Sequence, residues 1–352
     1  MRLPIFILSA CLLMAAQCTP TNAPPKLSAT PQHLPDGPLF IGVSVVDGET
    51  AWLSGTRSTV VRTTDGGTNW DVMQVAPEDS LQFRDVHAID AQRAYILSIG
   101  EGTDSRIYKT IDGGESWALQ FQNPWEGGFF DCLDFWDADH GLAFSDAVDG
   151  SFIIIRTKDG GANWERISPG ALPPALPGEG AFASSGTCLV THGDSTAWIG
   201  TGAGGEARLL RTDDRGETWR ADTTPLPHGT STSGFTSLTI LPDGRAAAAG
   251  SELMKPDSVY QNVAISEDRG NSWTLIGHPT YSGSIYGLSY VQAAPTPTLV
   301  AAGPGGLDVS YDGGASWSAL DTLNYWTVGF DDAGTGWAGG TDGKILKLRL
   351  EP

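Results

Sequence analysis

Residues 110–117 read Thr-Ile-Asp-Gly-Gly-Glu-Ser-Trp, and this pattern decides the fold because it recurs along the chain. Six segments share the form Ser/Thr-x-Asp-x-Gly-x-x-Trp, with 44–55 residues from one aspartate to the next. A repeat of this length indicates one structural unit copied in space rather than a set of unrelated domains. The aspartates are Asp65, Asp112, Asp159, Asp214, Asp268 and Asp312, and the tryptophans are Trp70, Trp117, Trp164, Trp219, Trp273 and Trp317.

The chemistry of this pattern is local. An aspartate can accept hydrogen bonds from backbone N–H groups of its own turn, and a glycine two residues later can take a positive φ. The tryptophan then begins the next strand with a large apolar area to bury. We therefore predict that each segment closes a β-hairpin and that its aspartate is structural rather than catalytic.

Each pattern lies in a longer unit of four short β-like runs. In one unit the runs are 83–89, 94–99, 106–110 and 116–119, separated by residues typical of turns. Four antiparallel strands in each repeat of about 40–50 residues are typical of a propeller blade. The predicted fold class is all-β, a β-propeller.

Seven units follow from the aromatic residues that open them. The last unit supplies three strands, so residues 27–39 are the expected donor of the fourth. A strand added there closes the ring and removes an open sheet edge. We predict a seven-bladed propeller over residues 38–350. The opening aromatics are Phe40, Phe83, Phe130, Phe182, Phe235, Tyr286 and Trp326.

Composition excludes several classes of function. The chain has 352 residues with 45 Gly and 22 Pro, and 21 Lys and Arg against 41 Asp and Glu give a net charge of −20. Such an acidic chain repels phosphate backbones and anionic lipid, so no nucleic-acid partner is expected. The sequence also lacks an HExxH motif and a dinucleotide-binding loop before a helix. We therefore predict no cofactor and no metal.

The N-terminus is predicted to be an export signal. Residues 1–17 combine one positive charge with an apolar run too short for a membrane span. We predict lipidation at Cys18, with plain signal cleavage as the alternative, and interpret residues 18–37 as a tether followed by the closing strand. This predicts a bacterial periplasmic or cell-surface lipoprotein whose membrane contact is the N-terminal lipid.

Two further cysteines, Cys132 and Cys188, belong to the folded part of the chain. An exported compartment permits a disulfide between them, and two small buried thiols are the alternative.

Chain direction predicts which face is free to bind. The repeated turns connect third to fourth strands, so the second-to-third and inter-blade links lie on the opposite face. Phe130 is equally a core candidate, Asp146 and Asp149 could close a turn, and calcium at these two aspartates is a further alternative. The candidate ligand-binding residues on this face are Trp125, Glu126, Phe130, Asp131, Asp146, Asp149 and Glu179.

The repeated turn resembles the Asp-box, or bacterial neuraminidase repeat, of sialidases, some xyloglucanases and sortilin-type receptors. At the level of whole units, including residues 135–146, the chain is similar to the photosystem II stability/assembly factor family and its heterotrophic bacterial members. That resemblance implies a propeller that binds membrane-protein subunits through a basic patch, whereas this chain is acidic. A sialidase is not expected, because Arg84 is the one clear first-strand arginine and sialidases need an arginine cluster.

The prediction for function is a non-enzymatic monomeric scaffold or assembly factor of the cell envelope that binds a protein or peptide. The alternative is a propeller that binds or cleaves a glycan.

Overall fold

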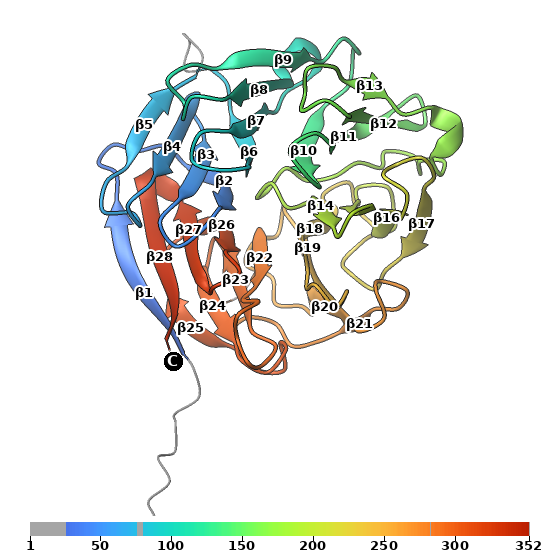
Figure 1. Cartoon of the computed structure of the whole chain (residues 1–352). Helices are drawn as coiled ribbons and strands as arrows, with labels where there is room; N and C mark the ends of the chain where they lie inside the picture. Colours follow the sequence, from blue (N-terminus) through green and yellow to red (C-terminus); the bar gives the residue numbers. More distant parts are fainter. Residues whose placement is uncertain (1–25, 76–79, 282, 352) are drawn as a thin grey trace, which may run out of the picture.

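The computed structural model describes residues 26–75, 80–281 and 283–351, which form a ring of seven four-stranded antiparallel sheets (Figure 1). Each of the first six blades uses four consecutive strands. The first strand of a blade lies nearest the central axis and the fourth lies outermost. The seventh blade is built from both ends of the described chain. The prediction of a seven-bladed all-β propeller is therefore confirmed.

The strands follow in order by blade. Blade 1 is β2 (Phe40–Val45), β3 (Ala51–Gly55), β4 (Thr59–Thr63) and β5 (Asp71–Gln74); blade 2 is β6 (Phe83–Ala88), β7 (Ala94–Ser98), β8 (Arg106–Thr110) and β9 (Ala118–Gln122). Blade 3 is β10 (Phe130–Phe135), β11 (Gly141–Val148), β12 (Ser151–Thr157) and β13 (Glu165–Arg166); blade 4 is β14 (Leu189–His192), β15 (Thr196–Gly200), β16 (Arg208–Thr212) and β17 (Arg220–Thr223). Blade 5 is β18 (Ser233–Ile240), β19 (Ala246–Glu252), β20 (Val263–Ser266) and β21 (Thr274–Leu275); blade 6 is β22 (Gly287–Tyr290), β23 (Leu299–Gly303), β24 (Gly306–Ser310) and β25 (Ser318–Asp321). Blade 7 is β26 (Tyr325–Phe330), β27 (Thr335–Gly340), β28 (Lys344–Glu351) and β1 (Lys26–His33).

Among the described residues, helix is confined to three single 3-10 turns, η1 (Gly102–Asp104), η2 (Pro169–Ala171) and η3 (Thr341–Gly343). In the described part of the chain, no helix has the length and apolar character needed to cross a membrane.

The ring is closed by β1, which lies along the outer side of β28 (Figure 1). The pairing is antiparallel over eight residue pairs, from Lys26 opposite Glu351 to His33 opposite Lys344. Leu27 is buried in the cluster between blades 6 and 7, and its N–H donates to the Tyr311 hydroxyl at 2.8 Å. The strand that precedes Phe40 in the sequence thus completes the last blade, as predicted from the three strands of the last unit.

The repeated turns, defined as the six Ser/Thr-x-Asp-x-Gly-x-x-Trp segments, share one set of hydrogen bonds. In the second turn the Thr110 hydroxyl donates to Asp112 Oδ1 at 2.8 Å and accepts the Gly114 N–H at 2.8 Å. Asp112 also accepts the Ser116 N–H and hydroxyl, at 2.9 and 2.5 Å. These hydrogen bonds lower the pKa of Asp112 to about 2, and the equivalent bonds hold the carboxylate in the other five turns.

The tryptophans of these turns pack between blades. Each is half-buried against the cluster formed by its own blade and the preceding one, as where Trp117 meets Trp52 edge-on with ring centroids 6.1 Å apart. Six of the seven inter-blade clusters therefore contain a tryptophan from a repeated turn. The seventh, between blades 6 and 7, contains Leu27 and Leu350. The repeat thus sets the number of blades through the packing that each tryptophan requires.

Candidate functional site

Two cavities lie on the axis of the ring, and one segment of chain separates them. Residues 181–187, here the crossing segment, leave the rim of blade 3 and cross the channel before β14 begins. Residues 181–184 line the larger cavity of about 550 Å³, and residues 185–187 line the smaller one of about 290 Å³. We call these the upper cavity and the lower cavity.

The crossing segment is hydrogen-bonded to blades 5 and 7. The Ser184 hydroxyl donates to the carbonyl of Thr236 in blade 5 at 2.8 Å, and Thr327 of blade 7 donates to the Ser185 carbonyl at 3.3 Å. The hydroxyls of Thr187 and Ser237 are 2.7 Å apart. Buried backbone must find partners inside the protein, and these side chains supply them. The segment is therefore held as a fixed wall across the channel.

The upper cavity opens on the face opposite the repeated turns. Those turns lie beside the first-to-second strand links, as where the Gly113 N–H donates to the Gln92 carbonyl at 2.9 Å. The cavity is lined instead by inter-blade links and by second-to-third strand links, which chain direction placed together on the other face. Its lining includes Phe129, Asp146, Gly180, Ala203, Ser231 and Leu253.

A recurring bulge turns first-strand side chains toward this cavity. In five of the seven first strands, the pairing register shifts across the residue that directly follows a buried aromatic. A β-bulge re-aims the side chain at the extra residue. Arg84, Asp131 and Trp326 occupy this position in blades 2, 3 and 7, and all three line the upper cavity.

Arg84 forms one wall of the cavity. Its Nη1 donates to the Ala183 carbonyl at 3.0 Å and its Nη2 donates to Gln82 Oε1 at 3.0 Å. The guanidinium also lies 5.7 Å from the Trp326 ring, whose centroid is 4.5 Å from that of Tyr286. Burial lowers the pKa of Arg84, and the charge of Asp131 opposes that shift. The arginine is thus committed mainly to the crossing segment and to the aromatic pair.

Asp131 and Asp146 form a carboxyl pair in the same cavity. Burial raises the pKa of Asp131 well above its usual value, and the adjacent Asp146 raises it further. Burial also raises the pKa of Asp146 to about 6, although the Ala181 N–H, 2.9 Å from its Oδ1, opposes the shift. Asp131 is 1% exposed, and its Oδ2 has no hydrogen-bond donor among the described residues. Two carboxyls this close tend to share one proton.

The other predicted site residues occupy different places. Glu126 and Asp149 are exposed on the same face, outside the cavity lining. Trp125 is half-buried under Arg166, whose guanidinium is 5.3 Å from the indole ring. Phe130 is fully buried in the core between blades 2 and 3 and has no surface for a ligand. Glu179 is also buried, and its carboxylate is paired with Arg208 and accepts the Thr201 hydroxyl at 2.6 Å.

Sequence reasoning missed Arg84, Tyr286 and Trp326 as site residues. Tyr286 and Trp326 are predicted from the sequence to open their units, but the residues equivalent to buried Phe83 are Ile285 and Tyr325. A shift of one residue moves a side chain from the core to the channel. Phe182 was also misplaced, because it lies in the crossing segment rather than at the start of a strand. The sequence signal for these channel-facing residues is a polar or aromatic residue directly after a buried aromatic.

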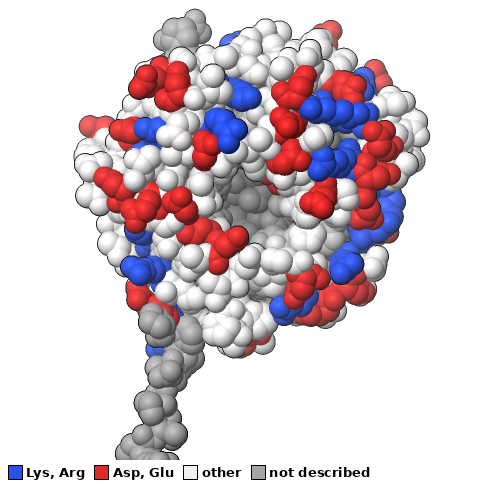
Figure 2. Space-filling model, viewed as in Figure 1, with Lys and Arg blue, Asp and Glu red and all other residues white. Residues whose placement is uncertain are grey.

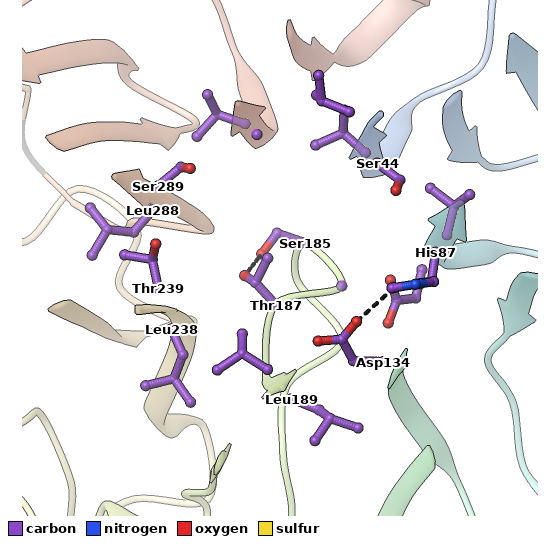
Figure 3. A pocket seen from close by; sticks show the side chains of 18 of the residues that line it. Ser44, His87, Asp134, Ser185, Thr187, Leu189, Leu238, Thr239, Leu288 and Ser289 are labelled. Carbon is purple, nitrogen blue, oxygen red and sulfur yellow. Dashed lines mark hydrogen bonds and ion pairs between the residues drawn. The ribbon is translucent and has the colours of Figure 1, made fainter. Parts of the chain in front are cut away.

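The lower cavity is ringed by side chains from successive first strands (Figure 3). His87 Nδ1 lies 2.7 Å from Asp134 Oδ1, and Asp134 Oδ2 accepts the Thr191 N–H at 2.7 Å. Figure 3 shows Ser185 and Thr187 of the crossing segment in the middle of this space, with their hydroxyls 2.7 Å apart. This cavity is smaller than the upper one, and these lining side chains bond to one another. The remaining members of the ring are Ser44, Thr239 and Ser289.

A disulfide joins β10 of blade 3, which lines the upper cavity, to the chain directly before β14 of blade 4. Cys132 follows Asp131 in β10, Cys188 follows the crossing segment, and their Cα atoms are 6.1 Å apart. The bond thus fixes the end of the crossing segment to the strand that carries Asp131.

Metal binding finds no support in the described ranges, where no three His, Cys, Asp or Glu side chains are grouped to hold an ion. The Asp146 and Asp149 loop therefore lacks the ligand cluster that calcium prefers.

Comparison with known proteins supports the fold. Residues 28–123 match the family model described as photosynthesis system II assembly factor YCF48. The solved structure of YCF48 bound to D1 peptide is 20% identical with a TM-score of 0.65, covering 92% of this chain and 97% of that one. YCF48 from Cyanidioschyzon merolae is 15% identical with a TM-score of 0.66, covering 91% and 98%.

A second kind of relative is an enzyme. The GH74 xyloglucanase from Xanthomonas campestris is 13% identical with a TM-score of 0.63, covering 91% of this chain and 53% of the enzyme. No curated protein sequence matches the chain. The protein is thus a seven-bladed propeller similar to the photosystem II assembly factor, and the resemblance predicted from its sequence is confirmed.

Proposed function

We propose that this propeller is a protein-binding scaffold of the assembly-factor type, which holds a peptide segment of its partner in the upper cavity. The observation that carries the proposal is the cavity itself, about 550 Å³ and lined by both charged and aromatic side chains. Ligand sites combine apolar walls with a few placed polar groups, and this cavity has both. The structural likeness to YCF48 bound to D1 peptide supports a peptide as the ligand.

Site-specific photo-crosslinking tests the proposal. A photoreactive phenylalanine replaces Leu253, which lines the cavity, and the full chain is irradiated in its native envelope fraction. We expect one recurrent protein partner, crosslinked through one short peptide and binding the purified propeller. The matched control places the same residue at Thr68, exposed in a repeated turn on the opposite face. Equal crosslinking at both positions, or none at Leu253, would contradict a binding site in the upper cavity.

Glycan binding is the second candidate. It is favoured by the GH74 likeness and by the Tyr286 and Trp326 rings, since aromatic faces can stack on sugar rings. Hydrolysis is not favoured at this cavity. Glycosidases hold their two carboxyls about 5–9.5 Å apart, whereas Asp131 and Asp146 are within hydrogen-bonding reach. Titration calorimetry with xyloglucan oligosaccharides separates the candidates. Only a glycan-binding protein should give a saturable heat of binding, and the Trp326→Ala variant should lose it.

Export and lipid anchoring are part of the same proposal. They rest on residues 1–25, which lie outside the described residues, and on the Cys132–Cys188 disulfide, a bond that persists in oxidising compartments. We propose that Cys18 carries the lipid of an envelope-facing scaffold. Metabolic labelling with a fatty-acid analogue should mark the wild type and not Cys18→Ser. Labelling of both would place any lipid elsewhere.

A further inference from the structure

We infer that the upper cavity recognises a basic side chain, lysine or arginine, of the partner peptide, and that Asp131 and Asp146 are the groups that receive it. This inference rests on the proposed function and names the chemistry of the anchoring residue.

The charged groups of the cavity can accept one more positive charge. Three charged residues line it, and they are one guanidinium, Arg84, and two carboxyls, Asp131 and Asp146. The guanidinium already donates to Ala183 and Gln82 and lies over Trp326. One cation therefore faces a carboxyl pair that shares one proton. An entering ammonium or guanidinium would take the place of that proton, which leaves to solvent, and would pair with the second carboxylate.

The carboxyl pair also lacks a donor. Asp146 Oδ1 receives the Ala181 N–H, and the two carboxyls bond to each other, but the buried Oδ2 of Asp131 receives no N–H or hydroxyl donor from the described residues. A buried acceptor without a donor carries a desolvation cost that no hydrogen bond offsets. A ligand that brings N–H donors removes that cost, whereas a carboxylate or phosphate would add a third acceptor. The pair therefore selects against anions.

The walls suit a cation as well. Tyr286 and Trp326 form an aromatic pair at 4.5 Å, and Phe129 and Phe182 also line the cavity. Aromatic faces attract ammonium and guanidinium groups within about 6 Å of the ring centroid. The aliphatic part of a long basic side chain can pack on these rings while its charged end reaches the carboxyls.

Charge around the site points the same way. The chain has a net charge of −20, and Glu126, Asp149 and Glu206 are exposed on links of this face. Figure 2 shows acidic side chains spread over one face of the ring, with basic side chains among them. A field of this sign raises the association rate of basic segments. The acidity of the chain and the composition of the cavity thus select the same class of partner.

A capped peptide library tests the inference on the full chain. Heptapeptides with acetylated N-termini and amidated C-termini carry charge only in their side chains. We expect binding to select lysine or arginine at one position at least tenfold over norleucine or acetyl-lysine. Asp146→Asn and Asp131→Asn, which keep the shape of each side chain, should each remove that preference. The matched control is Asp149→Asn, which removes one exposed charge on the link after β11 and should retain the preference.

The outcomes separate this inference from the proposed function. Peptides bound without a preference for basic residues would overturn the inference and leave the peptide scaffold in place. Equal loss of the preference in Asp149→Asn and Asp146→Asn would also overturn it, because general surface attraction would then account for the selection. Failure of every peptide to bind would reject both. The lysine against norleucine comparison uses the wild type, so it decides the inference even if a variant fails to fold.

Discussion

The guanidinium of Arg84 donates to the carbonyl of Ala183 at 3.0 Å, which ties blade 2 to the segment that crosses the channel from blade 3 to blade 4. Replacing Arg84 with methionine leaves that carbonyl and the neighbouring Asp131 without the donor and the charge. We expect the free energy of unfolding to fall by about 1–3 kcal/mol in urea denaturation. Arg245→Met, which removes an exposed ion pair with Asp243, should change it by less than about 0.5 kcal/mol. Equal effects would show that Arg84 does not support the crossing segment.

The carboxyl pair should make stability depend on pH. Both groups have a raised pKa in the folded state, near 6 for Asp146, so the folded protein binds more protons than the unfolded chain between about pH 4 and 6. The stability linked to these protons is therefore fully present below the ordinary carboxyl pKa and is lost as the pH rises through about 6.

The variant Asp146→Asn isolates this effect. We expect its melting temperature to exceed that of the wild type at pH 7.5, and the gain to shrink as the pH falls toward 5. The gain at pH 7.5 should correspond to roughly 1–3 kcal/mol, since one pKa unit is about 1.4 kcal/mol. Thermal melts at four pH values measure it, and exposed Asp149→Asn is the control. A difference that does not change with pH would contradict the shared-proton interpretation.

Reduction of the Cys132–Cys188 disulfide should destabilise the fold. The bond closes a loop with a sequence separation of 56 residues, for which the chain-entropy model gives about 4 kcal/mol. Calorimetry with and without dithiothreitol should show a clear fall in melting temperature. The double variant Cys132→Ala and Cys188→Ala should melt at the reduced temperature and no longer respond to the reductant. A wild type that melts alike in both conditions would mean the bond contributes nothing.

The threonine of a repeated turn should matter more than its exposed neighbour. In the fourth turn the buried Thr212 hydroxyl accepts the Gly216 N–H at 2.9 Å and donates to Asp214 Oδ1 at 2.8 Å. Thr212→Val leaves a buried donor unpaired, and we expect a loss of about 1–3 kcal/mol in urea denaturation. Thr218→Val removes an exposed bond to the same carboxylate and should cost less. The reverse order would mean that the turn is held from its outer side.

Removal of β1 should open the ring. Deleting residues 26–33 exposes the edge of β28 and uncovers the cluster that contains Leu27. We expect the melting temperature to fall by more than about 10 °C, since each kcal/mol is worth about 2–4 °C in a large domain. A synthetic peptide of residues 26–33 should restore part of the loss, whereas exposed Thr30→Ala should have little effect. An unchanged melt after the deletion would rule out closure by this strand.

The sequence predicted the blade count well because each repeated turn must bury its tryptophan against the blade before it. That requirement converts a linear repeat into a ring, and the unit lacking a fourth strand located the donor. The positions of Arg84 and Asp131 also follow a repeated pattern, because both come directly after a buried phenylalanine at a bulge. Asp131 was predicted as a site residue, whereas Arg84 was noticed only as an isolated first-strand arginine.

The crossing segment could not be predicted from the repeat. Phe182 stands where the other units place a core aromatic, but β14 begins only at Leu189, so blade 4 has a shortened first strand. Its preceding residues are held by hydroxyls of Ser237 and Thr327, contacts between blades distant in sequence. No local pattern encodes such contacts. For the same reason the sequence placed Glu179 in the site, although Arg208 from the next blade neutralises it.

The pairing of β1 with β28 has a consequence for biosynthesis. The Ser28 hydroxyl donates to the Glu351 carboxylate across 323 residues, so the first strand waits with an unsatisfied edge until the last strand has been made. A chain interrupted by early termination would keep that edge open to proteases and chaperones. Completion of the circle therefore requires β28, and a product truncated before that strand would keep an open sheet edge.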